Sequence, residues 1–154
     1  MIRLALVLCV LAGPALAEVR LRDPVTIILD EAKADCANLD GGVFEAPEGT
    51  VARVDLTGDG IVEFIVDAAK FVCSTSASYW GGTGGSQLSL VVEGKRLDYF
   101  AQEWKVIAWN KAPVLLLWLN GGECGGAGAD PCIEALVWSD YNHAFMSVRP
   151  AASE

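Results

Sequence analysis

The first 17 residues have the pattern of an export signal, and this feature constrains the rest of the chain more than any other. Arg3 precedes an apolar run from Leu4 to Ala12, and Ala15-Leu16-Ala17 fits the small-x-small pattern at which such signals are cleaved. The run is too short to span the ~30 Å hydrocarbon core of a bilayer, so we expect no membrane insertion after cleavage. The sequence therefore predicts a signal peptide at residues 1–17 and a single domain at residues 18–154, periplasmic or secreted.

Export also determines how the cysteines are interpreted, because an oxidising compartment favours disulfide bonds. Cys9 lies in the signal, which leaves four cysteines and three ways of pairing them. Cys124 and Cys132 bracket a short glycine-rich segment that folds back easily, and Cys36 is then left to pair with Cys73. The alternative is a zinc site, but the sequence has no CxxC pair and no histidine near these cysteines. We therefore predict the disulfides Cys36–Cys73 and Cys124–Cys132.

The mature chain begins with a pattern that is typical of one α-helix. Asp23 is a good N-cap, and Pro24 is a good first helical residue. Apolar residues then recur at helical spacing as far as Leu39, and a Gly-Gly pair ends the pattern. Cys36 falls on the apolar face, so we expect it to point into the core, where a cysteine of a strand can meet it.

Beyond the helix the apolar period changes to two, which is typical of strands. Short turns rich in Gly, Asn, Asp and Pro separate these segments, so neighbouring strands are expected to be antiparallel. Residues 97–109 carry aromatics in both registers, as in a bent or bulged strand, and residues 114–119 are continuously apolar, as in a central strand covered on both faces. We predict a mainly β fold (α+β), an antiparallel meander of about six or seven strands with one N-terminal α-helix packed on it. The predicted strands lie near residues 53–56, 62–66, 88–92, 97–109, 114–119, 133–138 and 144–148.

Residues 55–63, with the sequence DLTGDGIVE, form the most specific pattern in the chain. Oxygen-bearing side chains stand at positions 1, 3, 5 and 9, glycine at position 6 permits a sharp turn, and the carbonyl at position 7 adds an oxygen. A hard cation such as Ca²⁺ is bound by about six to eight oxygens from a curled loop of this kind. The alternative is a hairpin turn that keeps Asp-Gly for backbone reasons alone. The predicted calcium ligands are Asp55, Thr57, Asp59, the carbonyl of Ile61, and Glu63.

This loop resembles the calcium loop of FG-GAP and related repeats, in which a loop of the same length joins two β-strands. In this chain Thr57 replaces the usual Asp or Asn, and Glu63 replaces the usual Asp. Over residues 51–148, the single loop, a glycine-rich segment and a final Trp-containing hairpin resemble small exported bacterial proteins of uncharacterised function. The resemblance implies a calcium-binding hairpin and no known activity.

The charge and the residue types exclude several function classes. A net charge of −9 excludes nucleic acid and anionic membranes as main partners, because both bind basic surfaces. His143 is the only histidine, stands in a predicted turn and has no Gly-x-Ser-x-Gly serine to activate. Catalysis by a pair of carboxylates is not excluded, and glycoside hydrolysis uses such pairs. One candidate carboxylate is Glu103 beside Trp104.

We therefore expect an exported, non-catalytic module with a binding or inhibitory role and an unidentified protein or glycan as its ligand. A structural calcium ion is the one cofactor that the sequence suggests. Two alternatives stay open. One is a small envelope-polysaccharide hydrolase that uses carboxylates, and the other is a structural subunit of an envelope complex.

Overall fold

The computed structural model describes residues 22–148, so the predicted signal peptide and Cys9 lie outside the described residues. Helix α1 spans Pro24–Asn38, close to the bounds that its capping residues predict. The side chain of Asp23 accepts a hydrogen bond from the backbone N–H of Thr26 at 3.2 Å, which satisfies one of the N–H groups left free at the helix start. No helix within residues 22–148 has the length and apolar character needed to cross a membrane.

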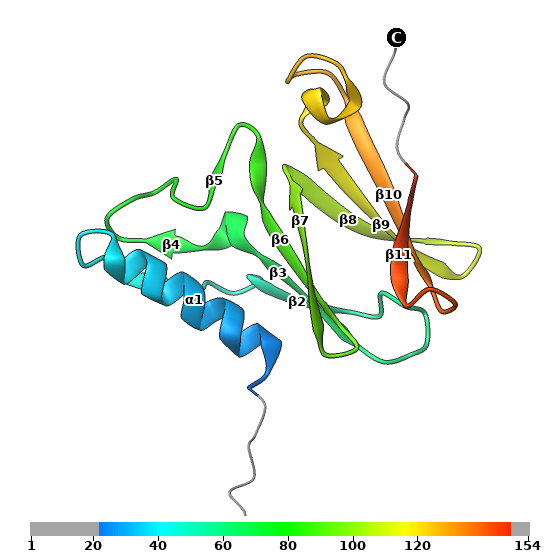
Figure 1. Cartoon of the computed structure of the whole chain (residues 1–154), viewed down its shortest axis with the longest axis horizontal. Coiled ribbons are helices and arrows are strands. Elements are labelled where there is room, and N and C mark those ends of the chain that lie inside the picture. Colours follow the sequence, from blue (N-terminus) through cyan, green and yellow to red (C-terminus); the bar gives the residue numbers. More distant parts are fainter. Residues whose placement is uncertain (1–21, 149–154) are drawn as a thin grey trace, which may run out of the picture.

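The strands that follow α1 are all paired in antiparallel fashion (Figure 1). They are β1 (Phe44–Glu45), β2 (Val51–Val54), β3 (Glu63–Asp67), β4 (Val72–Cys73), β5 (Gly81–Gly82), β6 (Gly85–Val92), β7 (Lys95–Ala101), β8 (Glu103–Trp109), β9 (Ala112–Leu119), β10 (Cys132–Ser139) and β11 (Ala144–Val148). Two short 3₁₀ helices, η1 (Ala68–Lys70) and η2 (Gly121–Cys124), follow β3 and β9. Strands β2, β3, β5, β6 and β7 form a five-stranded sheet, β8 to β11 form a four-stranded sheet, and β1 pairs with β4.

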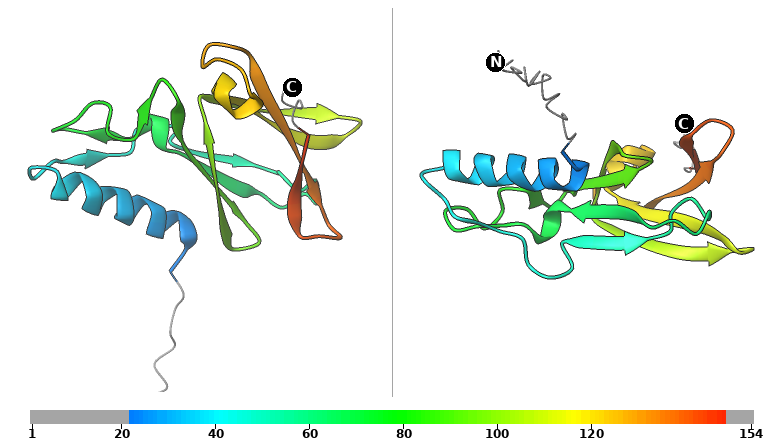
Figure 2. Two further views of the ribbon diagram at one scale, coloured as in Figure 1. Left: turned by 45° about the horizontal axis from the view of Figure 1, so that its top comes forward. Right: turned by 90° about the horizontal axis from the view of Figure 1, so that it is seen from below.

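The helix and the two larger sheets are arranged in three layers, with the five-stranded sheet in the middle. Figure 2 shows α1 on one side of this sheet and strands β8 and β9 on the other. One buried cluster joins α1 to the middle sheet, and a larger cluster fills the space between the two sheets. The larger cluster includes Ile65, Leu90 and Leu117, which are completely buried. Strands β3 and β6 are therefore covered on both faces.

The mainly β fold with one packed helix is confirmed, but the strands are more numerous than predicted. Residues 22–148 contain eleven strands, where about six or seven were expected, and three of the additional ones have two residues each. The stretch 97–109 is not one bent strand, because it is interrupted at Gln102 and contributes β7 to one sheet and β8 to the other. At this corner the N–H of Gln102 donates to the carbonyl of Trp118 at 2.7 Å. This hydrogen bond holds the point where the chain changes sheet against β9.

The structure contains both disulfides of the predicted pairing. Cys36 of α1 is bonded to Cys73 of β4 with a Cα–Cα distance of 5.6 Å, and Cys124 of η2 is bonded to Cys132 of β10 at 5.8 Å. Cys36 is completely buried, as its place on the apolar face of the helix predicts. The first bond therefore joins the helix layer to the small β1–β4 sheet, and the second closes the loop that leads into β10.

Candidate functional site

The predicted calcium loop joins β2 to β3, and its carboxylates accept hydrogen bonds from the loop's own backbone. Asp55 accepts from the N–H of Gly58 at 2.6 Å and, through its other oxygen, from that of Gly60 at 2.9 Å. Asp59 accepts from the N–H of Ile61 at 2.7 Å. Both glycines have positive φ, 82° and 86°, a conformation that other residues rarely adopt. These contacts hold the loop curled by protein groups alone.

Glu63, at the start of β3, closes the loop from inside. Its Oε2 accepts hydrogen bonds from the N–H groups of Leu56 at 2.6 Å and of Thr57 at 3.3 Å. Burial raises the pKa of Glu63 above its ordinary value, the two backbone hydrogen bonds lower it, and the charges of Asp59 and Asp55 add to the rise. The carboxylate therefore serves as an anchor for the loop backbone.

The loop as folded does not present a preformed cluster of metal ligands. Within residues 22–148, no three His, Cys, Asp or Glu side chains are placed so that they could hold a metal. Thr57 Oγ1 is buried without a hydrogen-bond partner and offers an unused oxygen. The carboxylates of Asp55 and Glu63 already accept hydrogen bonds from the loop backbone. Calcium binding stays a prediction, and the observed contacts are those of the alternative, a hairpin turn built for backbone reasons.

Asp55→Ala should lower the free energy of unfolding by about 2 kcal/mol, because two backbone N–H groups lose a charged acceptor. Asp59→Ala removes the acceptor of one such group and should cost about half as much. Urea denaturation in the presence of a chelator measures both losses. If Ca²⁺ raises the melting temperature of the wild type but not of Asp59→Ala, the loop opens to bind the ion and the protein-only account of the turn is wrong.

Glu63→Gln should make stability depend less on pH. Because the folded-state pKa of Glu63 is raised, the folded chain binds the proton more tightly than the unfolded chain does. The stability that this contributes is present at low pH and is lost as the pH rises through the folded-state pKa. The free energy of unfolding of the variant minus that of the wild type should therefore be larger near pH 7 than near pH 4. Urea denaturation of both proteins at both pH values measures this difference. If the difference is the same at the two pH values, the raised pKa of Glu63 is contradicted.

His143 lies in the turn between β10 and β11 and touches the tip of the β6–β7 hairpin. Its Nδ1 is 3.0 Å from Oε1 of Glu93, and both side chains are exposed. Because exposed polar contacts contribute little, His143→Ala should change the free energy of unfolding by no more than about 0.5 kcal/mol. Chemical denaturation measures this. A loss several times larger would mean that the pair clamps the two hairpins together.

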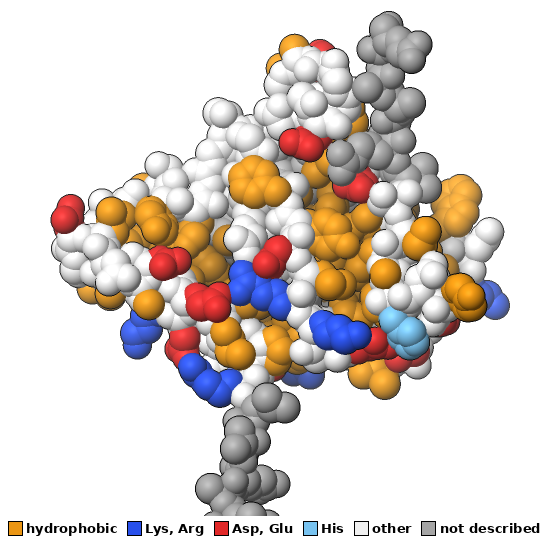
Figure 3. Space-filling model, viewed as in Figure 1, with side chains coloured by type: hydrophobic (Ala, Val, Ile, Leu, Met, Phe, Trp, Pro, Cys, Tyr) orange, Lys and Arg blue, Asp and Glu red, His pale blue; other side chains and the backbone are white. Residues whose placement is uncertain are grey.

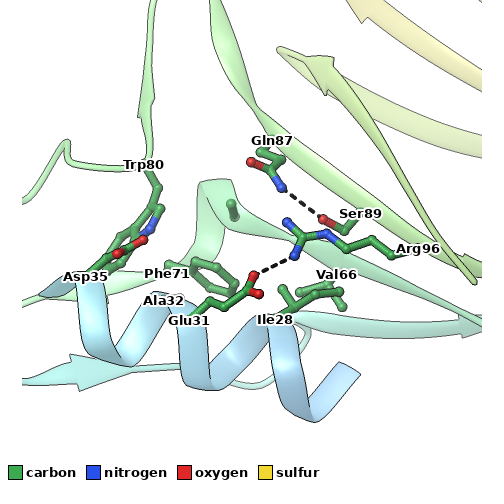
Figure 4. A pocket seen from close by; sticks show the side chains of 11 residues that line it. Ile28, Glu31, Ala32, Asp35, Val66, Phe71, Trp80, Gln87, Ser89 and Arg96 are labelled. Atoms are coloured by element: carbon green, nitrogen blue, oxygen red, sulfur yellow. Dashed lines mark hydrogen bonds and ion pairs between the residues drawn. The ribbon is translucent and has the colours of Figure 1, made fainter. Parts of the chain in front are cut away.

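The pocket between α1 and the five-stranded sheet is small, about 90 Å³, and the ion pair of Arg96 with Glu31 crosses it (Figure 4). Arg96 donates to Glu31 of α1 at 2.6 Å and to Asp98 at 2.8 Å. Burial raises the pKa of Asp98, but hydrogen bonds from Arg96 and Ser89 outweigh this effect, so the pKa lies below its ordinary value. This pocket therefore serves to fasten the helix to the sheet.

Apolar side chains are visible over the gap between β7 and β11 on the face that Figure 3 shows. A cleft of about 360 Å³ opens there between β7 and the four-stranded sheet. Tyr99 lies edge to face with Phe145 across the gap, with ring centroids 6.4 Å apart. Burial raises the pKa of Tyr99, and the charge of Glu134 adds to this. Glu134 and Glu123, which line the cleft, already have interaction partners.

A further cleft, of about 290 Å³, lies where the chain passes from the five-stranded sheet to the four-stranded sheet, and we call it the junction cleft. Asp67, at the end of β3, is buried there, and it accepts hydrogen bonds from Nε1 of Trp104 and from the N–H of Ala69, each at 3.0 Å. The first of these bonds connects the two sheets. The polar residues that line the junction cleft are Asp67, Lys70, Ser86, Gln102 and Glu103.

The face of the four-stranded sheet that points away from the core is apolar, and we call it the outer face. Alternate residues of β9 point inward, where Leu115 and Leu117 are buried, whereas Leu116 between them is only partly buried. None of the outer-face side chains belongs to either buried cluster of the described chain. The register of the strands sets these side chains next to one another. The principal apolar residues of the outer face are Trp109, Leu116, Trp118, Ile133, Val137 and Met146.

No protein-family model, curated protein or solved structure matches the chain. The junction cleft and the outer face are therefore the features on which a function can be based. The sequence pattern indicates Trp104 and Glu103, whereas the apolar run 114–119 predicts a strand covered on both faces, of which the described chain covers only the inner one. Nothing in the sequence indicates Asp67 or Ser86, because they come from separate strands that only the fold brings to one cleft.

Proposed function

We propose that the chain is an exported, non-catalytic binding module that docks a partner protein on the outer face of its four-stranded sheet. The observation that supports this is the exposure of the face, where Trp109 is 69% exposed and Met146 is 53% exposed. Single apolar residues are common on protein surfaces, whereas a contiguous apolar patch marks an interaction site. Here the patch is contiguous, since Val137 lies directly opposite Met146 and Ile133 lies directly opposite Trp118.

The residue pattern of β9 gives independent support. A strand with one solvated face shows polar residues at alternate positions, whereas a strand covered on both faces is apolar throughout. The outer-face positions of β9 hold Val114, Leu116 and Trp118, so the strand has the composition of one that is covered on both faces. The described chain covers only the inner face, and a partner protein would supply the second cover.

The composition of the outer face also resembles that of protein interfaces. Aromatic residues such as Trp109 and Trp118 are the side chains that most often dominate binding energy, and charged residues are typical of interface rims. Glu103 and Lys105 stand on the edge strand β8, on the same face as Trp118 and Leu116. We therefore expect the partner to present an apolar patch with polar groups at its margin.

The placement of the polar groups favours binding over carboxylate catalysis. Glu103 lies opposite Trp118 on the outer face, whereas Asp67 bonds to Trp104 on the inner side. Asp67 and Glu103 both line the junction cleft, but the two oxygens of Asp67 already accept hydrogen bonds from Ala69 and Trp104, which makes Asp67 a structural anchor. The cysteines within residues 22–148 are all in disulfides, which leaves no thiolate nucleophile in the described part of the chain.

Cross-linked capture from the exported fraction of the native host tests this proposal. Trp109→Ala should weaken binding of the captured partner about thirtyfold, which corresponds to about 2 kcal/mol for one aromatic hot spot. Phe100→Ala is the matched control, because it removes a 58% exposed aromatic residue from β7, away from the outer face, and should leave binding unchanged. Equal binding by the wild type and Trp109→Ala would contradict the proposal. Self-association of the wild type through this face would contradict it as well.

A further inference from the structure

The cleft of about 360 Å³ between β7 and the four-stranded sheet, which we call the seam cleft, is both apolar and acidic. Its apolar lining includes Tyr99 and Leu117, and its charged lining residues are two glutamates, Glu123 and Glu134. Glu134 is only 6% exposed. A carboxylate buried this deeply is stable only beside positive charge or hydrogen-bond donors. The seam cleft therefore favours a cationic group on a side chain that can also pack on apolar residues.

The register of β10 and β11 leads directly to Glu134. The two strands are antiparallel, and Ala135 lies opposite Val148, the last described residue of β11. One further step in this register sets position 149 opposite Glu134. Directly opposed residues of an antiparallel pair point to the same face of the sheet. Glu134 also lies opposite Leu117, which is buried between the sheets, so this face is the inner one that lines the seam cleft.

The alternation of side chains along β11 leads to the same face. Phe145 lies edge to face with Tyr99 and packs against the core between the sheets, so it points inward. Side chains two residues apart in a strand share a face, so positions 147 and 149 are expected to follow Phe145. Position 149 is an arginine, the one Lys or Arg among residues 149–154. Register and alternation therefore agree on a guanidinium beside Glu134.

We propose that the chain's own C-terminal segment occupies the seam cleft, with the guanidinium of Arg149 paired to the carboxylate of Glu134. A guanidinium forms two parallel hydrogen bonds with a carboxylate and also packs on aromatic rings, which matches a cleft lined by glutamates and Tyr99. Because a carboxylate can accept up to about four hydrogen bonds, Arg149 joins the interactions that Glu134 already makes. Pro150 follows Arg149 and has no N–H with which to continue the pairing.

This contact makes Arg149 a strap for β11, which is an edge strand whose sheet neighbour in the described chain is β10. Phe145, near the start of β11, already contacts Tyr99 of β7 across the gap. Arg149 fastens the other end of the strand and fills the seam cleft, so that an external ligand does not enter it. The strap lies on the inner face and is separate from the proposed docking surface. Because Met146 of the outer face belongs to β11, the strap also holds this part of the outer face in place.

A double-mutant cycle on the full mature chain tests whether the two side chains interact. Arg149→Gln and Glu134→Gln should each raise the equilibrium constant of unfolding in urea. In the double variant the rise should be about tenfold smaller than the product of the two single rises, because either substitution alone already removes the pair. Glu45→Gln, at an exposed carboxylate on β1, is the matched control, and its effect should simply multiply with that of Arg149→Gln.

Nuclear magnetic resonance of the same chain locates the guanidinium. The side chain of Arg149 should show nuclear Overhauser contacts with Glu134 and Tyr99, and its Nε–H should exchange with water about tenfold more slowly than that of Arg22. Arg22 is the matched control, because its side chain is 59% exposed in an ion pair with Asp30.

Two shortened chains test the effect on β11. In a chain that ends at Val148, the N–H groups of β11 that pair with β10 should exchange about tenfold faster than in the wild type, because the strap is lost. In a chain that ends at Pro150, which keeps Arg149, they should exchange at the wild-type rate.

Each of these measurements can overturn the proposal. Effects of Arg149→Gln and Glu134→Gln that simply multiply would show that the two side chains do not interact. An Arg149 Nε–H that exchanges as fast as that of Arg22, with no contact to the cleft, would place the guanidinium in water. Equal exchange of β11 in the two shortened chains would show that Arg149 fastens nothing. Capture of a partner protein at Trp109 is measured separately, so a failure of one proposal is distinguishable from a failure of the other.

Discussion

Cys36→Ser combined with Cys73→Ser should lower the free energy of unfolding by about 4 kcal/mol. The bond closes a loop with a sequence separation of 37, and a longer loop loses more freedom in the unfolded state. The separation of the second pair is 8, so Cys124→Ser with Cys132→Ser should cost only about 2.5 kcal/mol. Urea denaturation without reductant measures both double variants. An equal or greater loss for the second pair would contradict this order of contributions.

Leu117→Ala should destabilise the domain by about 3–4 kcal/mol, whereas Leu116→Ala should cost about 1 kcal/mol or less. The two residues are neighbours on β9 and point to opposite faces of the sheet. Leu117 is completely buried between the sheets, so its truncation leaves a cavity, whereas Leu116 is only partly buried on the outer face. The same denaturation experiment compares them directly. A cost for Leu116→Ala close to that of Leu117→Ala would mean that the outer face is already covered within the chain.

The helix and the disulfides could be predicted because their signals are local. Asp23 is a residue type that favours the N-cap and Pro24 one that favours the first helical position, and the observed helix begins at Pro24. The pairing of Cys124 with Cys132 follows from their short separation, and it leaves Cys36 to Cys73. Neighbouring residues determine the helix start and the Cys124–Cys132 bond, and elimination then gives the Cys36–Cys73 bond.

The division into two sheets could not be predicted, because no turn residue marks it. The segment around Gln102 has no glycine, proline, asparagine or aspartate, yet the chain changes sheet there. The change depends on contacts with distant residues, such as the carbonyl of Trp118 that Gln102 binds. The same holds for the junction cleft, whose Asp67 and Ser86 are brought together only when β3 and β6 lie in one sheet.

The loop at residues 55–63 shows why a ligand pattern alone is ambiguous. The spacing of Asp55, Asp59 and Glu63 predicts a calcium site, but a carboxylate can equally accept hydrogen bonds from backbone N–H groups. In the structure all three carboxylates do so. The continuous apolar run of β9 predicts cover on both faces, but the described chain covers only the inner face, and the bare face is the proposed docking surface.

Site-specific photo-cross-linking in the native host tests the docking surface most directly. A photoreactive amino acid at position 109 would stand on the outer face, and the same amino acid at position 100 would stand on β7 of the other sheet. We expect one discrete cross-linked partner protein from position 109 and no such product from position 100. Cross-links from position 100 with none from position 109, or no cross-link to another protein from either, would contradict docking on the outer face.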